Sequence, residues 1–370
     1  MTKFLFLNDT SEDYHFGCTC TSEFIRGQIL QHGTCTSMGV MDVWNKPAPS
    51  AEDWDNPAVF QAWMGEHPEW GEKLSACDAV ITNGEGTIMG WQGRQGTQTL
   101  LFLLYAAKKH LGKKVILINH SSYPQASPYA PETAESRRVG ELYAKVYRQL
   151  DFCAVRDMRS LAVLNALGCR NVRLAADCLP LYVSSHFTPA EPQGCGGYVL
   201  ISGGTLMNEH WQMFCDRVLP ALKQIAPQMM FLFAETPKRT AVDDELLLEK
   251  IKNYNRRLFR RRIGVIRAKT AEEWLSAIHR AKFFASGRFH HSLAALSVGT
   301  PFAVLGAHSP KNCLLLDVQP TAYLPWEQIP FLQLKPLFRS LEQQGANSIR
   351  REALCRMAMH NFDFWERCSL

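Results

Sequence analysis

Short apolar runs alternate with segments of helical spacing along the whole chain. The runs in the first half are "KFLFL", "DAVITN", "KKVILINH", "DFCAVRD" and "VRLAAD". A second series begins near Gly197 and comprises "GYVLISGG", "MMFLFAET", "RIGVIRA", "KFFASG" and "PFAVLG". Each run has the length of a strand and is followed by a helix-like or glycine-containing segment. This alternation predicts an α/β protein with two similar, Rossmann-like halves, each a parallel sheet covered by helices.

The segment between the two halves is composed like an exposed linker. "YVSSHFTPAEPQGCGG" is rich in Pro, Gly and Ser and lacks periodic apolar positions. We therefore expect a first domain over 1–190 and a second over 191–340. The segment 341–370 has helical apolar spacing and is expected to pack back on the first domain. The two domains should face a central cleft at the carboxyl ends of their strands, where open α/β sheets bind ligands.

Composition narrows the class of protein. The chain has 370 residues, is 46% hydrophobic, and carries a net charge of +5, which permits an anionic ligand or an acidic membrane surface. No nucleic-acid-binding motif is present. The 12 cysteines are scattered without CxxC spacing, which favours reduced thiols over disulfides or a zinc site. The chain also lacks a signal-peptide core and a long apolar segment, so we expect a cytoplasmic protein.

The stretch from Ser286 to Gly306, "SGRFHHSLAALSVGTPFAVLG", places an arginine and two histidines before a small, apolar helix. The helix should begin at Arg288 and end at Gly299. Free backbone amides and the positive end of the helix dipole make such a position an anion site, and arginine adds a bidentate donor. His290 or His291 would titrate near neutrality and could supply a proton.

The sequence around this turn carries no acidic residue from Ala281 to Leu316, whereas Arg288, His290, His291, His308 and Lys311 all occur there. The local field is therefore expected to be positive, and we expect an anionic ligand. In the alternative interpretation, the histidines bond backbone groups and Arg288 pairs with a distant carboxylate.

Three stretches carry a resemblance to a known family. "SGRFHHSLAALSVGTPFAVLGAHSPKN" resembles the C-terminal signature of the polysaccharide pyruvyl transferases. "CDAVITNGEGTIMG" is similar to the Gly-rich strand end of that family, and "AVRDMRSLAVLNALGCRNVRLAADCLPLYV" to its Arg-Asp strand, helix and Asp-containing strand. The stretches occur in the family's order between residues 77 and 312.

The resemblance implies a GT-B-like architecture and transfer of the enolpyruvyl unit of phosphoenolpyruvate to two sugar hydroxyls, giving a pyruvate ketal and phosphate. Phosphoenolpyruvate would be a co-substrate, and neither a cofactor nor a metal is expected. Arg288 and His290 would be catalytic residues that hold the donor, and Lys311 would face its phosphate. The donor set is completed by His291, Ser309, Gly203 and Gly204.

The acceptor is expected to be a glycan or lipid-linked saccharide of a cell-surface polysaccharide. "TNGEGTIMG" would contact it through Asn83, Gly84, Glu85 and Gly86, with Glu85 a catalytic base or a ligand of a sugar hydroxyl; a solvated turn is the alternative. Asp9 and His15 would join this acceptor side. Thr21 and Ser22 are expected to cap a helix. Arg156 and Asp157 are expected to pair or to cap a helix, and Asp177 to be structural.

One departure from the family pattern keeps a second enzyme class open. Family members place an arginine at the end of the first strand of the second half, where this chain has Gly203 and Gly204. A GT-B glycosyltransferase with a nucleotide-activated sugar donor is therefore an alternative, although the acid-free stretch lacks a carboxylate to hold a ribose. A third hypothesis is a non-catalytic sugar-binding protein.

The basic run "KIKNYNRRLFRRRIGVIRAK", from Lys250 to Lys269, has two interpretations. A peripheral contact with anionic lipid at the inner face of the membrane would suit a lipid-linked acceptor. A solvated helix face followed by a strand is the other interpretation. The sequence does not predict an oligomeric state.

Overall fold

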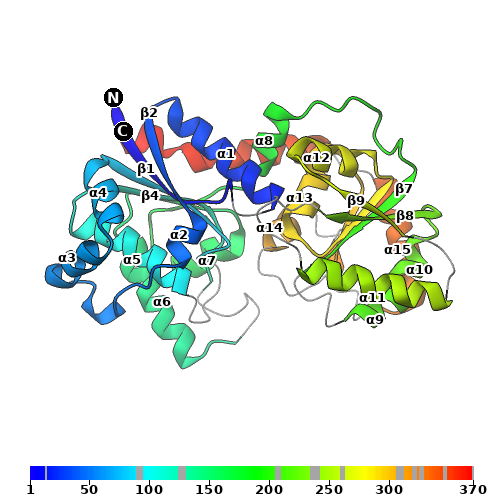
Figure 1. Ribbon diagram of the computed structural model, residues 1–370, viewed down its shortest axis with the longest axis horizontal. Helices are drawn as coiled ribbons and strands as arrows, with labels where there is room; N and C mark the ends of the chain where they lie inside the picture. The colour runs from blue at the N-terminus through cyan, green and yellow to red at the C-terminus, as the bar shows by residue number, and fades with distance from the viewer. Residues whose placement is uncertain are drawn as a thin grey trace. The chain divides into compact units, whose positions relative to one another are not determined.

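The computed structural model describes residues 1–12, 15–88, 95–123, 131–204, 210–233, 242–258, 263–305, 312–318, 323–324, 329–344 and 348–368. The chain divides into two compact units (Figure 1). The first unit contains Met1–Asp13, Thr21–Cys178 and Arg356–Leu370, and the second contains Tyr14–Cys20 and Leu179–Cys355. Each unit is built on one six-stranded sheet whose neighbouring strands are all parallel.

The sheet of the first unit has the order β2-β1-β3-β4-β5-β6. Its strands in chain order are β1 (Thr2–Asp9), β2 (Gly33–Gly39), β3 (Ala79–Glu85), β4 (Lys114–His120), β5 (Phe152–Val155) and β6 (Val172–Leu174). The strand order reverses between β1 and β3, so the crevice between their carboxyl ends is the topological switch point where such sheets bind ligands.

The sheet of the second unit has the order β12-β11-β10-β7-β8-β9. Its strands are β7 (Tyr198–Ser202), β8 (Gln228–Phe233), β9 (Gly264–Arg267), β10 (Phe283–Ser286), β11 (Phe302–Leu305) and β12 (Tyr323–Leu324). Read from β9, this is the 3-2-1-4-5-6 order of the dinucleotide-binding Rossmann fold, and its switch point lies between β7 and β10.

Helices cover the two sheets (Figure 1). Those up to residue 186 are α1 (Phe16–Leu30), α2 (Val40–Trp44), η1 (Ala51–Asp53), α3 (Pro57–Glu66), α4 (Pro68–Ala76), α5 (Gln95–Lys109), α6 (Ala134–Tyr147), α7 (Met158–Ala166) and α8 (Leu179–His186). The later ones are α9 (Trp211–Met213), η2 (Phe214–Val218), α10 (Leu219–Leu222), α11 (Val242–Leu258), α12 (Ala271–Arg280), α13 (Phe289–Val298), α14 (Cys313–Val318), α15 (Phe331–Gln344), α16 (Ser348–Met359), η5 (His360–Phe362) and α17 (Phe364–Arg367).

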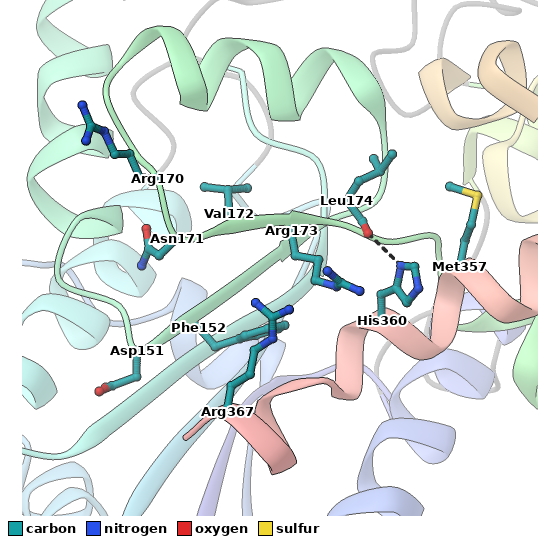
Figure 2. Close-up of a pocket in the computed structure, with 10 residues that line it drawn as sticks. All are labelled: Asp151, Phe152, Arg170, Asn171, Val172, Arg173, Leu174, Met357, His360 and Arg367. Atoms are coloured by element: carbon teal, nitrogen blue, oxygen red, sulfur yellow. Dashed lines mark hydrogen bonds between the residues drawn. The ribbon is translucent and has the colours of Figure 1, made fainter. Parts of the chain in front are cut away.

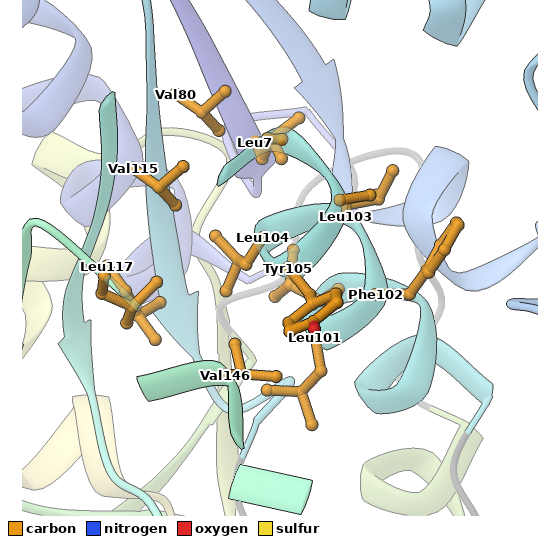
Figure 3. Close-up of a cluster of buried hydrophobic side chains, with 14 of the residues drawn as sticks. Leu7, Val80, Leu101, Phe102, Leu103, Leu104, Tyr105, Val115, Leu117 and Val146 are labelled. Atoms are coloured by element: carbon orange, nitrogen blue, oxygen red, sulfur yellow. The ribbon is translucent and has the colours of Figure 1, made fainter. Parts of the chain in front are cut away.

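The core of the first unit forms where α5 packs on the sheet. The run "TLLFLLYAA" in α5 is apolar on all sides and wholly buried, as expected for a helix enclosed in a protein interior. Figure 3 shows the α5 side chains beside strand residues such as Leu7, Val80 and Val115 and beside Val146 of α6. This packing anchors the strands whose carboxyl ends carry the polar residues described below.

The unit boundaries differ from those expected from sequence. The first unit was expected to end near residue 190, but α8 packs with α13 in the second unit, so the change of unit falls between Cys178 and Leu179. The last segment was expected to begin at 341, whereas α15 belongs to the second unit and the first unit resumes at Arg356. Within the described part of the chain, every helix is too short or too polar to cross a membrane.

Candidate functional site

A chain of hydrogen bonds joins the two strands at the switch point of the second unit. Ser202 ends β7 and Ser286 ends β10, and the Ser202 hydroxyl donates to Ser286 Oγ at 2.7 Å. The Nδ1 atom of His291 lies 2.9 Å from Ser202 Oγ, and the Arg288 amide donates to Ser286 Oγ at 3.0 Å. These bonds fix the first turn of α13 against the strand ends.

Arg288 is the N-cap residue of α13, as expected, but its guanidinium has an acidic partner. Its Nη2 and Nε atoms lie 2.8 and 3.2 Å from Oδ2 of Asp244 on α11. The Arg288 side chain is 26% exposed and that of Asp244 is 4% exposed. The expectation of a uniformly positive site is therefore wrong, because folding brings in a carboxylate that lies 44 positions away in the chain.

The two glycines after β7 allow neighbouring groups to approach closely. A Cβ at Gly203 would lie 2.0 Å from Oδ1 of Asp244, so the space a side chain would take there holds the partner of Arg288. Gly204 packs in the same way on Gly287. Their amides as phosphate ligands stay a prediction, as does any role of Ser309 and Lys311, which lie outside the described residues.

The two histidines of α13 have different surroundings. Burial, with Arg288 and His290 nearby, holds the pKa of His291 well below its usual range. His291 is therefore neutral at neutral pH and is a poor proton source. His290 is buried beside Cys18, with Nδ1 3.6 Å from Sγ, and its ring makes an edge contact with His15 at 5.2 Å. His15 was expected on the acceptor side but lies in this cluster instead.

Polar side chains also meet at the switch point of the first unit. Asn119 Nδ2 donates to Asn83 Oδ1 at 2.9 Å, and Asn8 Nδ2 donates to the Asn83 carbonyl at 2.6 Å. Asn8, Glu85 and Asn119 have φ angles of 62°, 42° and 56°, which are uncommon for residues other than glycine. Strained backbone of this kind gathers at ligand-binding sites. Sequence reasoning included Asn83 and Glu85 but missed Asn8 and Asn119.

Glu85 belongs to a buried ionic group rather than a solvated turn. Arg156 Nη1 lies 2.7 Å from Asp177 Oδ2 and 4.0 Å from Glu85 Oε2, and both pairs are almost fully buried. Burial opposes the charge on Arg156, but Asp177, Glu85 and Asp157 together raise its pKa. Arg156 thus holds Glu85 at the strand end and neutralises part of its charge.

The remaining acceptor-side residues have local roles. Gly84 packs on His120, Gly86 lies in the turn after β3, and Asp9 Oδ1 accepts from the Ser11 amide at 3.0 Å. The expectation that Thr21 and Ser22 cap a helix is wrong, because α1 already begins at Phe16. Ser22 Oγ instead accepts from the Thr10 amide and from Asn83 Nδ2.

A pocket of about 530 Å³ lies beside β6 in the first unit (Figure 2). Arg173 and Arg367 point into it, and His360 Nδ1 lies 3.2 Å from the Leu174 carbonyl. It contains none of the residues predicted from sequence. Because it follows an edge strand rather than the carboxyl ends of the strands, we do not place the reaction there.

Solved structures establish the fold class. The chain is similar to a putative UDP-N-acetylglucosamine 2-epimerase from Listeria monocytogenes, with 10% identity, a TM-score of 0.55, and coverage of 96% of this chain and 91% of that chain. It is also similar to the UDP-GlcNAc 2-epimerase from Methanocaldococcus jannaschii, with 11% identity, a TM-score of 0.57 and coverage of 94% of each chain. The UDP-GlcNAc 2-epimerase from Neisseria meningitidis, solved with bound UDP-GlcNAc, matches with 13% identity, a TM-score of 0.57 and coverage of 99% of each chain. At such identities the likeness shows the fold alone. That fold is GT-B-like, as predicted.

The family follows from the sequence itself. The family model for polysaccharide pyruvyl transferase matches residues 7–309, so the chain belongs to that family. The family predicted from the three motifs is confirmed, and the protein is a transferase with a role in pyruvyl transfer to polysaccharide. A search of curated proteins finds no match.

Proposed function

We propose that the protein transfers the enolpyruvyl unit of phosphoenolpyruvate to two hydroxyls of one sugar, in a cell-surface polysaccharide or its lipid-linked precursor. The observation that carries this proposal is the position of Arg288. It occupies the N-cap position of α13 at the switch point of a Rossmann sheet, is partly exposed, and is held by Asp244. A guanidinium fixed at the positive end of a helix dipole suits a donor that carries both a phosphate and a carboxylate.

The proposed reaction has two steps. A proton is added to the terminal carbon of the donor, and the resulting oxocarbenium-like centre is attacked by one sugar hydroxyl, which loses its proton. The second hydroxyl then attacks the same carbon, displaces phosphate and gives up its proton, which the leaving phosphate can accept, and the ketal is closed. Arg288 would stabilise the phosphate as it departs. His290 is the proposed acid or base, because His291 is held neutral by its surroundings.

The acceptor is assigned to the strand ends of the first unit. Asn8, Asn83 and Asn119 bond one another and so orient the strand ends, where Glu85 provides a carboxylate. Because Arg156 already balances charge there, Glu85 is suited to accept a hydrogen bond from a hydroxyl. Glu85 is the proposed acceptor-side base.

Thermal unfolding with phosphoenolpyruvate tests the donor assignment. Saturating donor should raise the Tm of the wild-type protein, since a ligand at 100 times its Kd stabilises by about 2.7 kcal/mol. Arg288→Ala should abolish the shift. The matched control is Arg280→Ala, which removes an exposed arginine of the same unit paired with Glu191, and it should keep the shift. An equal shift in both variants would refute the assignment.

A nucleotide-sugar donor is the second outcome of the same experiment. Asp244 supplies a carboxylate beside Arg288, so the acid-free stretch does not argue against ribose binding. A panel of nucleotide sugars is therefore tested in parallel. If a nucleotide sugar stabilised the protein and phosphoenolpyruvate did not, the protein would be a glycosyltransferase that has the sequence pattern and fold of a pyruvyl transferase.

A further inference from the structure

The starts of α1 and α13 bring together two histidines and a cysteine, side-chain types that coordinate transition metals. Cys18 Sγ lies 3.6 Å from His15 Nε2 and 3.6 Å from His290 Nδ1. The three ligand atoms all lie within 4.8 Å of one another. All three residues belong to the second unit, so the cluster is formed within one compact body.

The two sulfur–nitrogen distances match those of a tetrahedral metal centre, while the separation of the two ligand nitrogens is at most 4.8 Å, against roughly 3.3 Å in a tetrahedral site. With metal–sulfur and metal–nitrogen bonds of about 2.3 and 2.0–2.1 Å, the sulfur and nitrogen ligands of tetrahedral zinc lie roughly 3.6 Å apart. Both sulfur–nitrogen distances in the cluster have this value. A thiolate with two imidazoles is also a donor set that favours zinc over magnesium or calcium, which prefer oxygen ligands.

The backbone holds the cluster in place. The amides of Cys18 and Thr19 both donate to the His15 carbonyl, which fixes His15 and Cys18 on one turn. A Cβ at Gly17 would lie 2.3 Å from Cβ of His290, so the missing side chain is what lets His290 approach. Cys18 and His290 are buried while His15 is partly exposed, which leaves a route by which an ion can enter.

We propose that His15, Cys18 and His290 bind one divalent transition-metal ion, with zinc as the best fit. On binding, the Cys18 thiol releases its proton and the thiolate coordinates the ion together with His15 Nε2 and His290 Nδ1. Three protein ligands leave one tetrahedral position open, as in reactive rather than structural zinc sites. Coordination through Nδ1 keeps the remaining proton of the His290 ring on Nε2, so a metal-bound His290 cannot also act as a base in pyruvyl transfer, and that role belongs to the metal-free protein. The proposal does not rest on pyruvyl transfer, and it departs from the sequence-based prediction that no metal is bound.

The test uses the full-length protein stripped with a chelator and titrated with Co²⁺, followed by competition with Zn²⁺. We expect one equivalent per chain, a thiolate-to-cobalt charge-transfer band and intense tetrahedral d–d bands, all lost when Zn²⁺ is added. Cys18→Ser should remove the charge-transfer band. Since changes outside the ligand shell already weaken metal affinity about 10- to 100-fold, loss of the ligand should weaken it more than about 100-fold.

Two matched pairs of variants make the result specific. Gly17→Ala should weaken binding by displacing His290, whereas Gly27→Ala, in the same helix with open space around its Cβ, should not. Cys195→Ser removes an exposed thiol and should leave the spectrum unchanged. If Cys18→Ser does not fold, His15→Gln, at a partly exposed position, is the ligand variant.

The site would be overturned if the wild-type protein bound neither Co²⁺ nor Zn²⁺. It would also be overturned if the Cys18 and His15 variants bound the metal as well as the wild type does. The three side chains would then be a cluster joined by hydrogen bonds alone. The metal titration contains no pyruvyl donor, so a failure to bind metal can be told apart from a failure of the Arg288 experiment.

Discussion

At the scale of single residues, the partners of some charged side chains could be predicted from the sequence, whereas the partners of others could not. The dipeptide Arg156-Asp157 was expected to pair or cap, and Asp157 caps α7 by accepting from the Ser160 amide while Arg156 pairs with Asp177. The partner of Arg288 was not predictable. Asp244 lies in a different helix, and its approach depends on the space left at Gly203.

The Arg156–Asp177 pair should be costly to break from one side. Both side chains have no exposed area, so Asp177→Asn leaves a buried guanidinium without its main counter-charge. We expect a loss of about 3–5 kcal/mol in the free energy of unfolding, measured by urea denaturation. Glu132→Gln, in the exposed pair with Arg137, is the control and should cost less than about 1 kcal/mol. Equal, small losses would contradict this account.

His120 should make stability depend on pH. Burial, followed by the charge of Arg156, lowers its pKa from 6.5 to about 3. As pH falls below 6.5, the unfolded chain binds a proton that the folded protein does not, so stability decreases from there down to about pH 3. Between pH 8 and 5.5, the wild type should lose about 1.4 kcal/mol more than His120→Gln. Parallel pH profiles for the two proteins would show that His120 is protonated in the fold.

At the scale of elements, buried strands were predictable and polar edge strands were not. The ten apolar runs quoted from the sequence all contain observed strands. Eight of these strands are largely buried, and a strand covered on both faces needs continuous apolar residues. The other two, β6 and β9, are partly exposed edge strands that still carry an apolar run. β2, with the sequence "GTCTSMG", was missed. It lies at the edge of its sheet, is partly exposed, and lacks such a run.

Helix ends are set by local hydrogen bonds, which the sequence signalled at Asp157 but misplaced at Thr21 and Ser22. Thr270 caps α12, where its Oγ1 accepts from the Glu273 amide at 3.1 Å. Thr270→Ala should lower the free energy of unfolding by about 1 kcal/mol, whereas Thr270→Ser should change it by a few tenths. Chemical denaturation of both variants measures this difference. Equal losses would assign the effect to the threonine methyl group rather than to the cap.

At the scale of the molecule, the two similar halves were predictable from the repeated alternation, but their boundaries were not. Composition identified a linker near residue 190, yet it is burial against α13 that assigns α8 to the second unit. Likewise, the sequence cannot show that the short segment Tyr14–Cys20 belongs to the second unit, since no composition shift marks it.

Two compact units should unfold in separable steps. Domains with their own cores depart from two-state behaviour, so we expect the calorimetric enthalpy of unfolding to exceed the van't Hoff enthalpy. Thr270→Ala should lower the transition of the second unit, and Asp177→Asn that of the first. Differential scanning calorimetry resolves these effects. A single transition that both variants shift equally would mean that the units unfold as one.

The interleaving of the two units along the chain has a consequence for biosynthesis. Asn361, in the segment from Arg356 onward, accepts a hydrogen bond from the Asn119 amide through Oδ1 and donates one to the Ala176 carbonyl through Nδ2. On the ribosome, this residue emerges only after every residue of the second unit has been translated. The first unit must therefore wait in an incomplete state while the second is made. The nascent chain departs from the usual N-to-C order of domain maturation, because Phe4, near its start, gains its ring contact with Trp365 only after the second unit has been made.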